Sequence, residues 1–398
     1  MQVNAKRKTS VYLGFKSLFM TDNIVGKQQF TSFKAAERLL LGPGPTTIHP
    51  RVLQALSQPT LGHLDPDVIR MMDEIKAMLR IAFDTKNEHT FLVSAPGSVG
   101  MECSFVNLVE AGDKVIICTN GYFGDRMKQV AERAGAEVVL VTSEWGKPID
   151  PQDLEAALKN HEDAKIVGFV SSETSTGVRN DTKALCAVAK AHGCLTIVDA
   201  VTTLGAIEFH VDDWQVDVAY SCSQKGLGSV PGLSPITFSE AAINKIKNRT
   251  KSVSSWFLDI NNVWPYWGSF EKRAYHHTAP VNSFYAVHES LVMLMEEGME
   301  ASWSRHAENH RYFAMKMQEI GMEFFVEEAY RLPQLNTVVL KAGMDDAALR
   351  QRLLLEFGIE VGAGLGAGFG KLWRIGLMGY GSNKGNIDRL MKALGEVL

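Results

Sequence analysis

The sequence has few cysteines, and they form no pattern typical of a disulfide framework or a metal site. Its five cysteines are odd in number and scattered, with no Cys-x-x-Cys pair. Such usage predicts reduced, mostly buried thiols in a reducing compartment. The segment "HAENH", residues 306–310, is not a His-Glu-x-x-His motif, so the sequence predicts no metal site.

Long apolar runs and an excess of one charge are also missing. No apolar stretch reaches the roughly 18 residues that span a bilayer, and the formal net charge is only -4 at pH 7. No sustained basic stripe with interleaved aromatic residues occurs, so we expect neither membrane nor nucleic-acid binding. Repeats and low-complexity linkers are lacking too, and the 45% of hydrophobic and 22% of charged residues are ordinary for a globular protein.

The first 20 residues, "MQVNAKRKTSVYLGFKSLFM", are basic, lack acidic residues and are mildly amphipathic. This composition fits a mitochondrial presequence, but it fits equally well an extension ahead of Met20. The C-terminal "GEVL" is not a peroxisomal address. We therefore expect a cytoplasmic protein, with a mitochondrial location as the alternative if the basic segment is a presequence.

Short β-branched runs alternate with helix-like stretches over about residues 40–280. The apolar runs are "HTFLVSA", "KVIICTN", "AEVVLVTS", "KIVGFVSS", "CLTIVDA", "DVAYSCS" and "LSPITFS". Such alternation predicts an α/β fold whose mostly parallel sheet of seven strands is covered on both faces.

From about residue 282 the pattern changes to one long helical stretch, which we expect to bend near Gly298. A smaller α+β segment with "NTVVLKA", "FGIEVGAG" and "KLWRIGLMG" follows. We therefore divide the chain into an N-terminal extension (1–38), a large domain (39–297) and a small C-terminal domain (298–398).

One carboxylate interrupts an apolar run. "CLTIVDAVTTLG", residues 194–205, reads as a buried strand with Asp199 near its end. A buried carboxylate costs several kcal/mol to desolvate unless a partner compensates it. Asp199 either caps free backbone N–H groups at a turn or faces a buried cation.

Further polar residues follow other predicted strands. In "SAPGSVGMECSF" a strand gives way to a helix, so the backbone N–H groups of Gly97 and Ser98 can face an anion. "SSETSTGV", residues 171–178, is a dense cluster of hydroxyls, and "AYSCSQKGLGSVPG" sets Lys225 before a glycine-rich turn. Each of these is an ordinary turn when taken alone. All of them fall at the carboxyl ends of strands, where α/β sheets bind ligands.

Together these residues indicate a pyridoxal phosphate site. Lys225 follows Asp199 by 26 positions, at the next predicted strand end. A lysine amine can form a Schiff base with the cofactor aldehyde, an aspartate can pair with the protonated pyridine nitrogen, and a helix N-terminus can hold the phosphate.

The chain resembles the class V aminotransferases of fold type I, and among them the alanine:glyoxylate and serine:pyruvate aminotransferase group. The resemblance runs from Leu39 to the C-terminus. Seven motifs carry it in the family's order: "LLLGPGPTTIHPRVLQAL", "NGYFGDR", "ETSTGV", "VDAVTTLG", "YSCSQKGL", "AYHHTAPV" and "KLWRIGLMG".

The resemblance implies a role for each matching residue. Lys225 is the Schiff-base lysine, and Asp199 is the partner of the pyridine nitrogen. The remaining cofactor contacts fall on Phe123 and Val201 at the ring faces, Thr174 near the 3-hydroxyl, Gly97, Ser98 and Gln224 at the phosphate, and Tyr275 and Thr278 at the phosphate of the neighbouring subunit. Arg374 clamps the substrate carboxylate, and the Gly44 backbone lines the same pocket. Pro96 departs from the usual phosphate turn.

The resemblance thus implies a homodimer with shared active sites and a ping-pong aminotransferase. It would move the amino group of alanine or serine to glyoxylate or pyruvate. Ureidoglycine:glyoxylate and 3-hydroxykynurenine transaminases are alternatives among relatives. A cysteine desulfurase-like lyase is less favoured, since no cysteine follows Cys222. A non-catalytic cofactor-binding protein would not need Arg374.

Overall fold

The computed structural model describes residues 31–269 and 272–398. The basic segment of the first 20 residues lies outside these ranges. Residues 31–37 are exposed and have no regular secondary structure, and residues 38–398 form one compact unit. No helix in the described ranges is both long and apolar enough to cross a membrane.

The centre of this unit is a sheet of seven strands, as the sequence predicts. Their spatial order is β2 (His89–Val93), β10 (Ser234–Phe238), β9 (Val218–Tyr220), β8 (Leu195–Asp199), β5 (Ile166–Val170), β3 (Lys114–Thr119) and β4 (Glu137–Thr142). Strand β10 is antiparallel to both neighbours, and all other pairs are parallel. The predicted α/β fold of type I is therefore confirmed.

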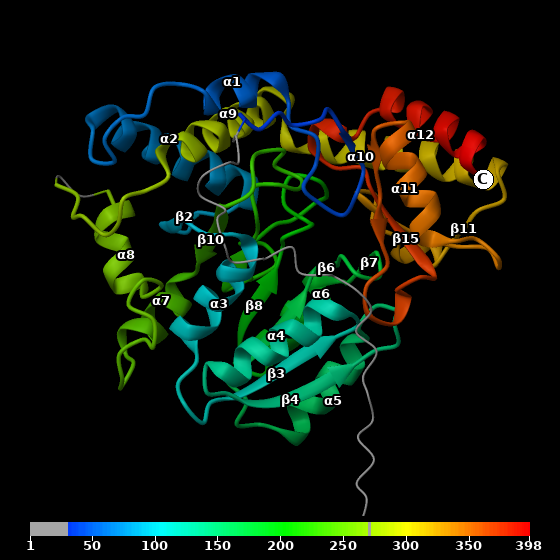
Figure 1. Ribbon diagram of the computed structural model, residues 1–398. Helices are drawn as coiled ribbons and strands as arrows, with labels where there is room; N and C mark the ends of the chain where they lie inside the picture. The colour runs from blue at the N-terminus through cyan, green and yellow to red at the C-terminus, as the bar shows by residue number, and fades with distance from the viewer. Residues whose placement is uncertain (1–30, 270–271) are drawn as a thin grey trace, which may run out of the picture. The chain divides into compact units, whose positions relative to one another are not determined.

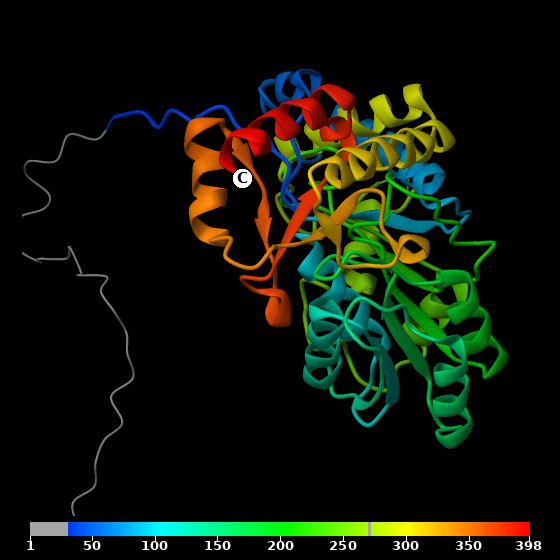
Figure 2. The same ribbon diagram turned by 90° about the vertical axis from the view of Figure 1, so that its right-hand side faces the viewer.

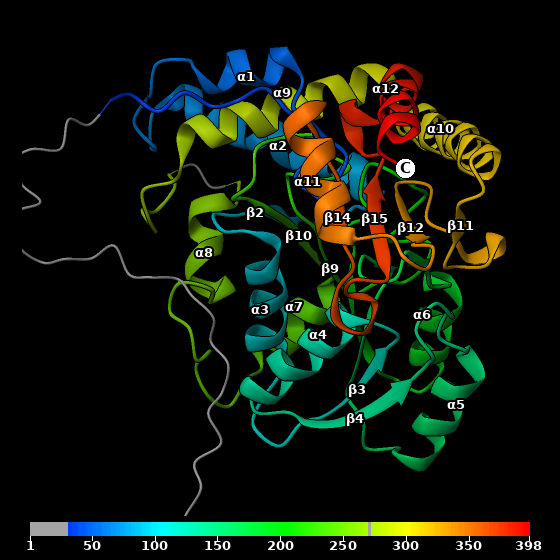
Figure 3. The same cartoon turned by 45° about the vertical axis from the view of Figure 1, so that its right-hand side comes forward.

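Four helices cover the two faces of this sheet (Figures 1 and 3). Helices α3 (Gly97–Leu108) and α4 (Tyr122–Arg133) pack side by side on one face, and α5 (Pro151–Asn160) and α6 (Thr182–Ala191) pack together on the other. Asp150 and Asp181 accept backbone N–H groups at the starts of α5 and α6, as acidic N-caps do. The N-caps of α3 and α4 make no side-chain hydrogen bond.

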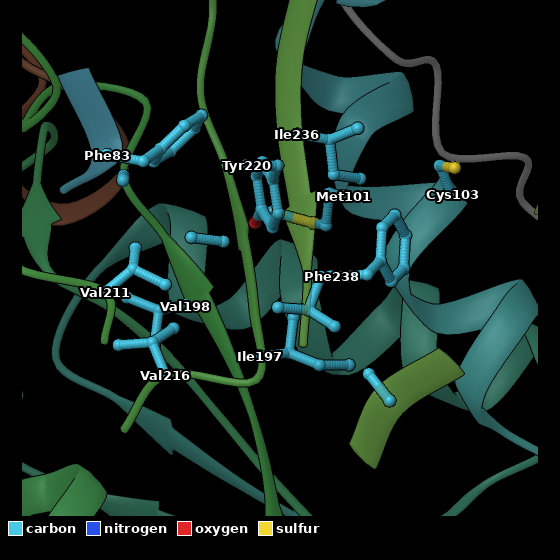
Figure 4. Packing of buried hydrophobic residues seen from close by; sticks show 14 of the residues in the cluster. Phe83, Met101, Cys103, Ile197, Val198, Val211, Val216, Tyr220, Ile236 and Phe238 are labelled. Carbon is cyan, nitrogen blue, oxygen red and sulfur yellow. The ribbon is translucent and has the colours of Figure 1, made fainter. Parts of the chain in front are cut away.

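The sheet and its helices enclose one large apolar core. Ile197 of β8, Tyr220 of β9 and Phe238 of β10 meet there with Met101 and Cys103 of α3 (Figure 4). All five cysteines are buried and unpaired, in agreement with the predicted reduced thiols.

Other elements frame the large sheet. Helix α9 (Val281–Glu297) runs along α1 (Pro50–Leu56) and α2 (Pro66–Phe83) at the top of Figure 1. The remaining elements of this part are α7 (Glu240–Lys247), α8 (Ile260–Trp267) and the two-stranded sheet of β6 (Ser172–Glu173) and β7 (Val178–Arg179). Near Gly298, where a bend is expected, the helix is interrupted. α9 ends before Gly298, whose φ is 87°, and α10 (Met299–Glu319) starts after it.

The C-terminal part has its own antiparallel sheet and core, seen in orange and red in Figure 2. The sheet order is β11 (Glu323–Phe324), β12 (Leu335–Val339), β15 (Leu372–Gly376) and β14 (Gly362–Ala363). Helices α11 (Asp346–Glu356) and α12 (Lys384–Val397) and the 3-10 turns η1 (Glu328–Tyr330), η2 (Gly366–Gly368) and η3 (Gly379–Gly381) accompany it.

The chain enters this second core before it builds the large sheet. Strand β1 (Leu39–Leu40) pairs in parallel with β13 (Ile359–Glu360). Leu39 and Leu41 are buried in the C-terminal core. The segment that follows, with Gly44, is therefore held between the two parts of the molecule.

Candidate active site

Asp199 ends strand β8 and is only 4% exposed. One carboxylate oxygen accepts the Val201 amide N–H at 2.8 Å, and the other accepts the Tyr220 hydroxyl from strand β9 at 2.8 Å. Burial raises the pKa of the Asp199 carboxyl, and these two hydrogen bonds act in the opposite direction. Asp199 thus closes a turn, as one of its two readings expects, yet it keeps acceptor positions for a cationic partner.

Lys225 lies in the loop after β9 and is 7% exposed. Its Nζ donates to Oγ1 of Thr202 at 2.9 Å and to Oγ1 of Thr174 at 3.2 Å. Burial lowers the pKa of the Lys225 amine. Within the described part of the chain no carboxylate forms an ion pair with it, so no direct contact offsets the effect of burial.

Gly44, in the "GPGP" motif, allows the chain to pass directly over Lys225. Its φ is 117°, a conformation that favours glycine. A Cβ atom added there would lie 3.1 Å from both Cγ and Cε of Lys225. The sequence-predicted Gly44 is therefore in the site.

The first turn of α4 brings two side chains to the same place. The Phe123 ring centroid lies 5.9 Å from Lys225 Nζ. The Arg126 guanidinium lies 4.9 Å from that centroid, and its Nη1 donates to Ser98 Oγ at 3.0 Å. Phe123 and Ser98 are therefore joined through Arg126.

The N-terminus of α3 lies against the turn that follows β8. A Cβ atom at Gly97 would lie 3.1 Å from Val201 Cγ2 and 3.1 Å from Cys222 Cβ, so glycine lets the helix end sit against Val201. Pro96 is the N-cap and supplies no side-chain hydrogen bond. In residues 31–269 and 272–398 the amide N–H groups of Gly97 and Ser98 find no acceptor, which suits an anion.

Arg374 lies on β15 and reaches the pocket from the C-terminal sheet. It is 7% exposed; Nε donates to the Ala363 carbonyl at 2.8 Å and Nη1 to the Thr174 carbonyl at 3.5 Å. Burial lowers the pKa of Arg374 to about 10, so the guanidinium stays charged at neutral pH. Its other N–H donors remain for a carboxylate.

Tyr275 and Thr278 are not brought to this pocket of their own chain. Tyr275 is 62% exposed and packs against His63 at 5.2 Å between ring centroids. Thr278 is exposed as well. The other predicted site residues are joined to Lys225 or Asp199 by the contacts above. Gln224 precedes Lys225 in the chain, and its backbone carbonyl accepts the Thr46 N–H.

Three site residues were not found from the sequence. Thr202 holds the Lys225 amine, Tyr220 holds Asp199, and Arg126 joins Phe123 to Ser98. Tyr220 is the register partner of Asp199 on the neighbouring strand. The sequence does carry a signal for Tyr220, because the hydroxyl of a tyrosine in a fully buried strand needs a hydrogen-bond partner.

The residues present fit pyridoxal phosphate. Among the described residues, Lys225 is buried and forms no ion pair, and the N–H groups of Gly97 and Ser98 at the start of α3 have no acceptor. Asp199 keeps acceptor positions for a cation. The Gln224 Oε1 atom is also buried without a hydrogen-bond partner in the described residues. An aldehyde, a pyridinium nitrogen and a phosphate are groups that satisfy these positions.

Lys225→Met is expected to raise the free energy of unfolding of the cofactor-free protein by about 1 kcal/mol or more at pH 7. Folding desolvates the protonated amine, so its pKa falls below the ordinary 10.5. The cost is complete below the lowered pKa and vanishes as the pH rises to 10.5. Urea unfolding at pH 7 and pH 10 measures the difference. Equal stabilities of variant and wild type at pH 7 would contradict this expectation.

Comparison with known proteins identifies the family of this chain. Residues 39–390 match the family model "Aminotransferase class-V". The alanine–glyoxylate aminotransferase of Oryctolagus cuniculus is 38% identical, over 91% of this chain and 92% of its own length. The (S)-ureidoglycine–glyoxylate transaminase of Bacillus subtilis (strain 168) is 34% identical, over 91% and 90%.

A solved structure agrees with this assignment. The crystal structure of the alanine–glyoxylate aminotransferase from Nostoc sp. has a TM-score of 0.91 and 44% sequence identity to this chain. The match covers 93% of this chain and 97% of the Nostoc sp. chain. With Lys225, Asp199 and Arg374 close together in the expected fold, the chain belongs to the class V aminotransferases, which use pyridoxal phosphate.

Proposed function

We propose that this protein transfers the amino group of a small neutral amino acid, alanine or serine, to glyoxylate. The observation that carries the proposal is the buried Lys225 amine, set between Thr174, Phe123 and the Gly44 backbone. Both the O. cuniculus and the B. subtilis relative have glyoxylate in their names, which supports the acceptor more firmly than the donor.

Several residues would hold the cofactor. When bound, pyridoxal phosphate supplies an aldehyde that exchanges amino groups and a ring that spreads the negative charge of the substrate α-carbon. The N–H groups of Gly97 and Ser98, with Gln224, would bind the phosphate. Arg126 touches Ser98 and would add positive charge at the same end.

The ring would be held by residues on the other side of the pocket. Phe123 and Val201 would pack on its faces, and Thr174 would approach the 3-hydroxyl side. The Asp199 carboxylate would pair with the ring nitrogen. The Val201 N–H and the Tyr220 hydroxyl orient that carboxylate and oppose the rise of its pKa that burial causes.

Lys225 would act as the base that moves the α-proton of the substrate. A general base must be neutral before it accepts a proton, and burial lowers the pKa of this amine in the required direction. Thr202 and Thr174 accept hydrogen bonds from Nζ. These bonds fix the position of the amine when it is not bonded to the cofactor.

Arg374 would bind the α-carboxylate of every substrate by two parallel hydrogen bonds, beside the Gly44 backbone. Its Nε and Nη1 atoms donate to the Ala363 and Thr174 carbonyls. These contacts fix the plane of the guanidinium, which presents the remaining donors to the pocket.

Arg374→Lys is expected to lower kcat/KM of both half-reactions alike, because lysine cannot make the bidentate contact. The loss should correspond to on the order of 2 kcal/mol of activation free energy. The measurement is a kinetic panel of alanine, serine, aspartate and glutamate with glyoxylate, pyruvate and 2-oxoglutarate. Small neutral donors should be best and glyoxylate the best acceptor. Arg350→Lys, at an ion pair with Asp346 in α11, is the matched control.

This panel also tests the proposed function itself. If glutamate and 2-oxoglutarate were the best pair, the reading of the pocket would be wrong. A preference for ureidoglycine over alanine and serine would move the assignment to the alternative that the B. subtilis relative represents.

A cysteine desulfurase-like activity is not supported by the thiols. Cys222 is the cysteine nearest to Lys225 in the sequence, and none follows it. Its thiol is buried, its Sγ lies 3.7 Å from the Val201 carbonyl, and burial raises its pKa to about 11. A reactive cysteine needs an accessible thiolate, which this residue does not offer.

The active unit would be a homodimer whose partner subunits share phosphate sites. Tyr275 and Trp256 are 62% and 64% exposed, and Trp256 stacks on the neighbouring His276 at 4.8 Å between ring centroids. Exposed aromatic side chains that lie together are typical of an interface. Tyr275 and Thr278 would then reach the cofactor phosphate of the partner.

Mixed dimers test this arrangement. A Lys225→Ala chain and a Tyr275→Phe/Thr278→Ala chain should each be nearly inactive. One site of every hybrid dimer keeps both contributions, so random mixing should restore about a quarter of the wild-type activity. No recovery, with hybrid formation shown by differential tagging, would rule out the shared site.

A further inference from the structure

Glu173 on β6 is a fully buried carboxylate that none of the roles above uses. Its relative exposure is 0%. It accepts the backbone N–H groups of Phe123 and Gly124, both at 3.2 Å, and the N–H and hydroxyl of Ser175 at 3.0 and 2.6 Å. Ser175 Oγ in turn accepts the Tyr122 N–H at 2.9 Å. This pair therefore binds the first three N–H groups of helix α4.

Helix α4 depends on this distant pair because it has no cap of its own. Its N-cap is Gly121, which makes no side-chain hydrogen bond. A Cβ atom at Gly121 would lie 2.5 Å from Glu173 Cγ and 2.5 Å from Ser175 Oγ. The missing side chain thus lets the helix end contact Glu173. Burial raises the pKa of this carboxyl, and the N–H donors of the helix end oppose that rise.

The same segment touches two further functional side chains. Thr174, between Glu173 and Ser175, accepts Lys225 Nζ on its hydroxyl and Arg374 Nη1 on its carbonyl. The Phe123 ring stands 5.9 Å from Lys225 Nζ. Residues 173–175 therefore fix the helix end that carries Phe123 relative to the lysine and the arginine.

We propose that Glu173 is a positioning residue that holds the Phe123 ring against the bound cofactor by capping α4 from a distant strand. The inference rests on the proposed function, in which Phe123 packs on the cofactor ring. A purely structural role would change the stability of the protein but not its affinity for the cofactor once folded. The affinity is therefore the quantity that separates the two roles.

Glu173→Met keeps the length of the side chain but removes both acceptor oxygens. Four donors, the N–H groups of Phe123 and Gly124 and the N–H and hydroxyl of Ser175, then lose their partner, and the Phe123 ring is no longer fixed in place. The Kd of the full chain for pyridoxal phosphate should rise about fivefold, as expected for the loss of one aromatic stacking contact. Glu173→Gln keeps one oxygen and should recover part of this loss.

A double-mutant cycle with Phe123→Ala tests the connection. Phe123→Ala alone should raise the Kd by a similar factor, and Glu173→Met in that background should add less than about twofold, because both changes remove one contact. The Kd is measured by titrating the full-length protein with pyridoxal phosphate and following tryptophan fluorescence. Asp181→Ala removes the cap of α6 and is the control that should lower stability alone.

The outcomes separate the inference from the function on which it rests. A Kd for Glu173→Met equal to that of Asp181→Ala, or a full fivefold effect in the Phe123→Ala background, would overturn the positioning role. A wild-type protein that does not bind pyridoxal phosphate would contradict the proposed function instead. If Glu173→Met does not fold, Ser175→Ala, which removes the Tyr122 acceptor, enters the cycle with the same expected sign.

Discussion

Replacing Lys225 with alanine is expected to lower the turnover number by at least about 10³-fold, because in the proposed function this one side chain would supply both the nucleophile and the base. In the wild type, borohydride reduction of the protein with pyridoxal phosphate should attach the label to Lys225. Peptide mapping by mass spectrometry identifies the labelled lysine. Label on a different lysine would show that the covalent site was assigned to the wrong residue.

Lys76 provides a matched control for this experiment. It lies on helix α2 and is also a buried lysine, 4% exposed. Its Nζ donates to Ser269 Oγ at 3.0 Å. Lys76→Met, like a change of Lys225, removes a buried amine whose pKa burial lowers, but it should leave the label on Lys225 and the turnover number close to wild type. The comparison separates the loss of a buried lysine from the loss of the reacting one.

The second large effect is expected at Asp199. Asp199→Asn keeps the shape of the side chain but removes the charge that would face the cofactor ring nitrogen. The rate of α-proton abstraction should fall by about 10²–10³-fold, and Asp199→Glu should be less severe because the charge remains. Loss of the α-proton of alanine in deuterated water, followed by NMR at saturating cofactor, measures this step.

Asp217 is the control for Asp199. It too is a buried aspartate, 3% exposed, and it accepts the Thr196 N–H at 2.8 Å and pairs with Lys190. It precedes β9, whereas Asp199 ends β8, so the two carboxylates lie at opposite edges of the sheet. Asp217→Asn should cost stability and leave proton abstraction intact. Near-normal abstraction in Asp199→Asn would mean that the carboxylate does not support the reaction.

The large sheet could be predicted because its signal is local. Each strand of the sheet is a short apolar run with β-branched residues, and the intervening helices begin at polar or small residues. Parallel topology then places the strand ends at one edge, and with them Asp199, Lys225 and the α3 N-terminus.

The contacts within the site could not be read in the same way. Tyr220 reaches Asp199 because β8 and β9 pair in one particular register, and Thr202 reaches Lys225 through the path of a turn. Neither depends on residues close in the chain. Similarly, Glu173 begins the "ETSTGV" motif, but its contact with α4 joins positions 50 apart.

The N-terminal strand shows the same limit. β1 has two residues, and its partner β13 lies about 320 positions later. No local sequence pattern indicates such a pair. The predicted domain division therefore assigns Leu39 to the large domain, whereas its side chain packs in the C-terminal core. The division at residue 298 stays a prediction, as do the roles of the individual site residues.

A half-reaction with the wild-type protein tests the central claim most directly. The protein loaded with pyridoxal phosphate is mixed with excess alanine, with no acceptor present, and then freed of alanine and given glyoxylate. Ping-pong transamination should release one equivalent of pyruvate per active site in the first step and one equivalent of glycine in the second. Pyruvate formed only when both substrates are present, or no glycine in the second step, would contradict the account.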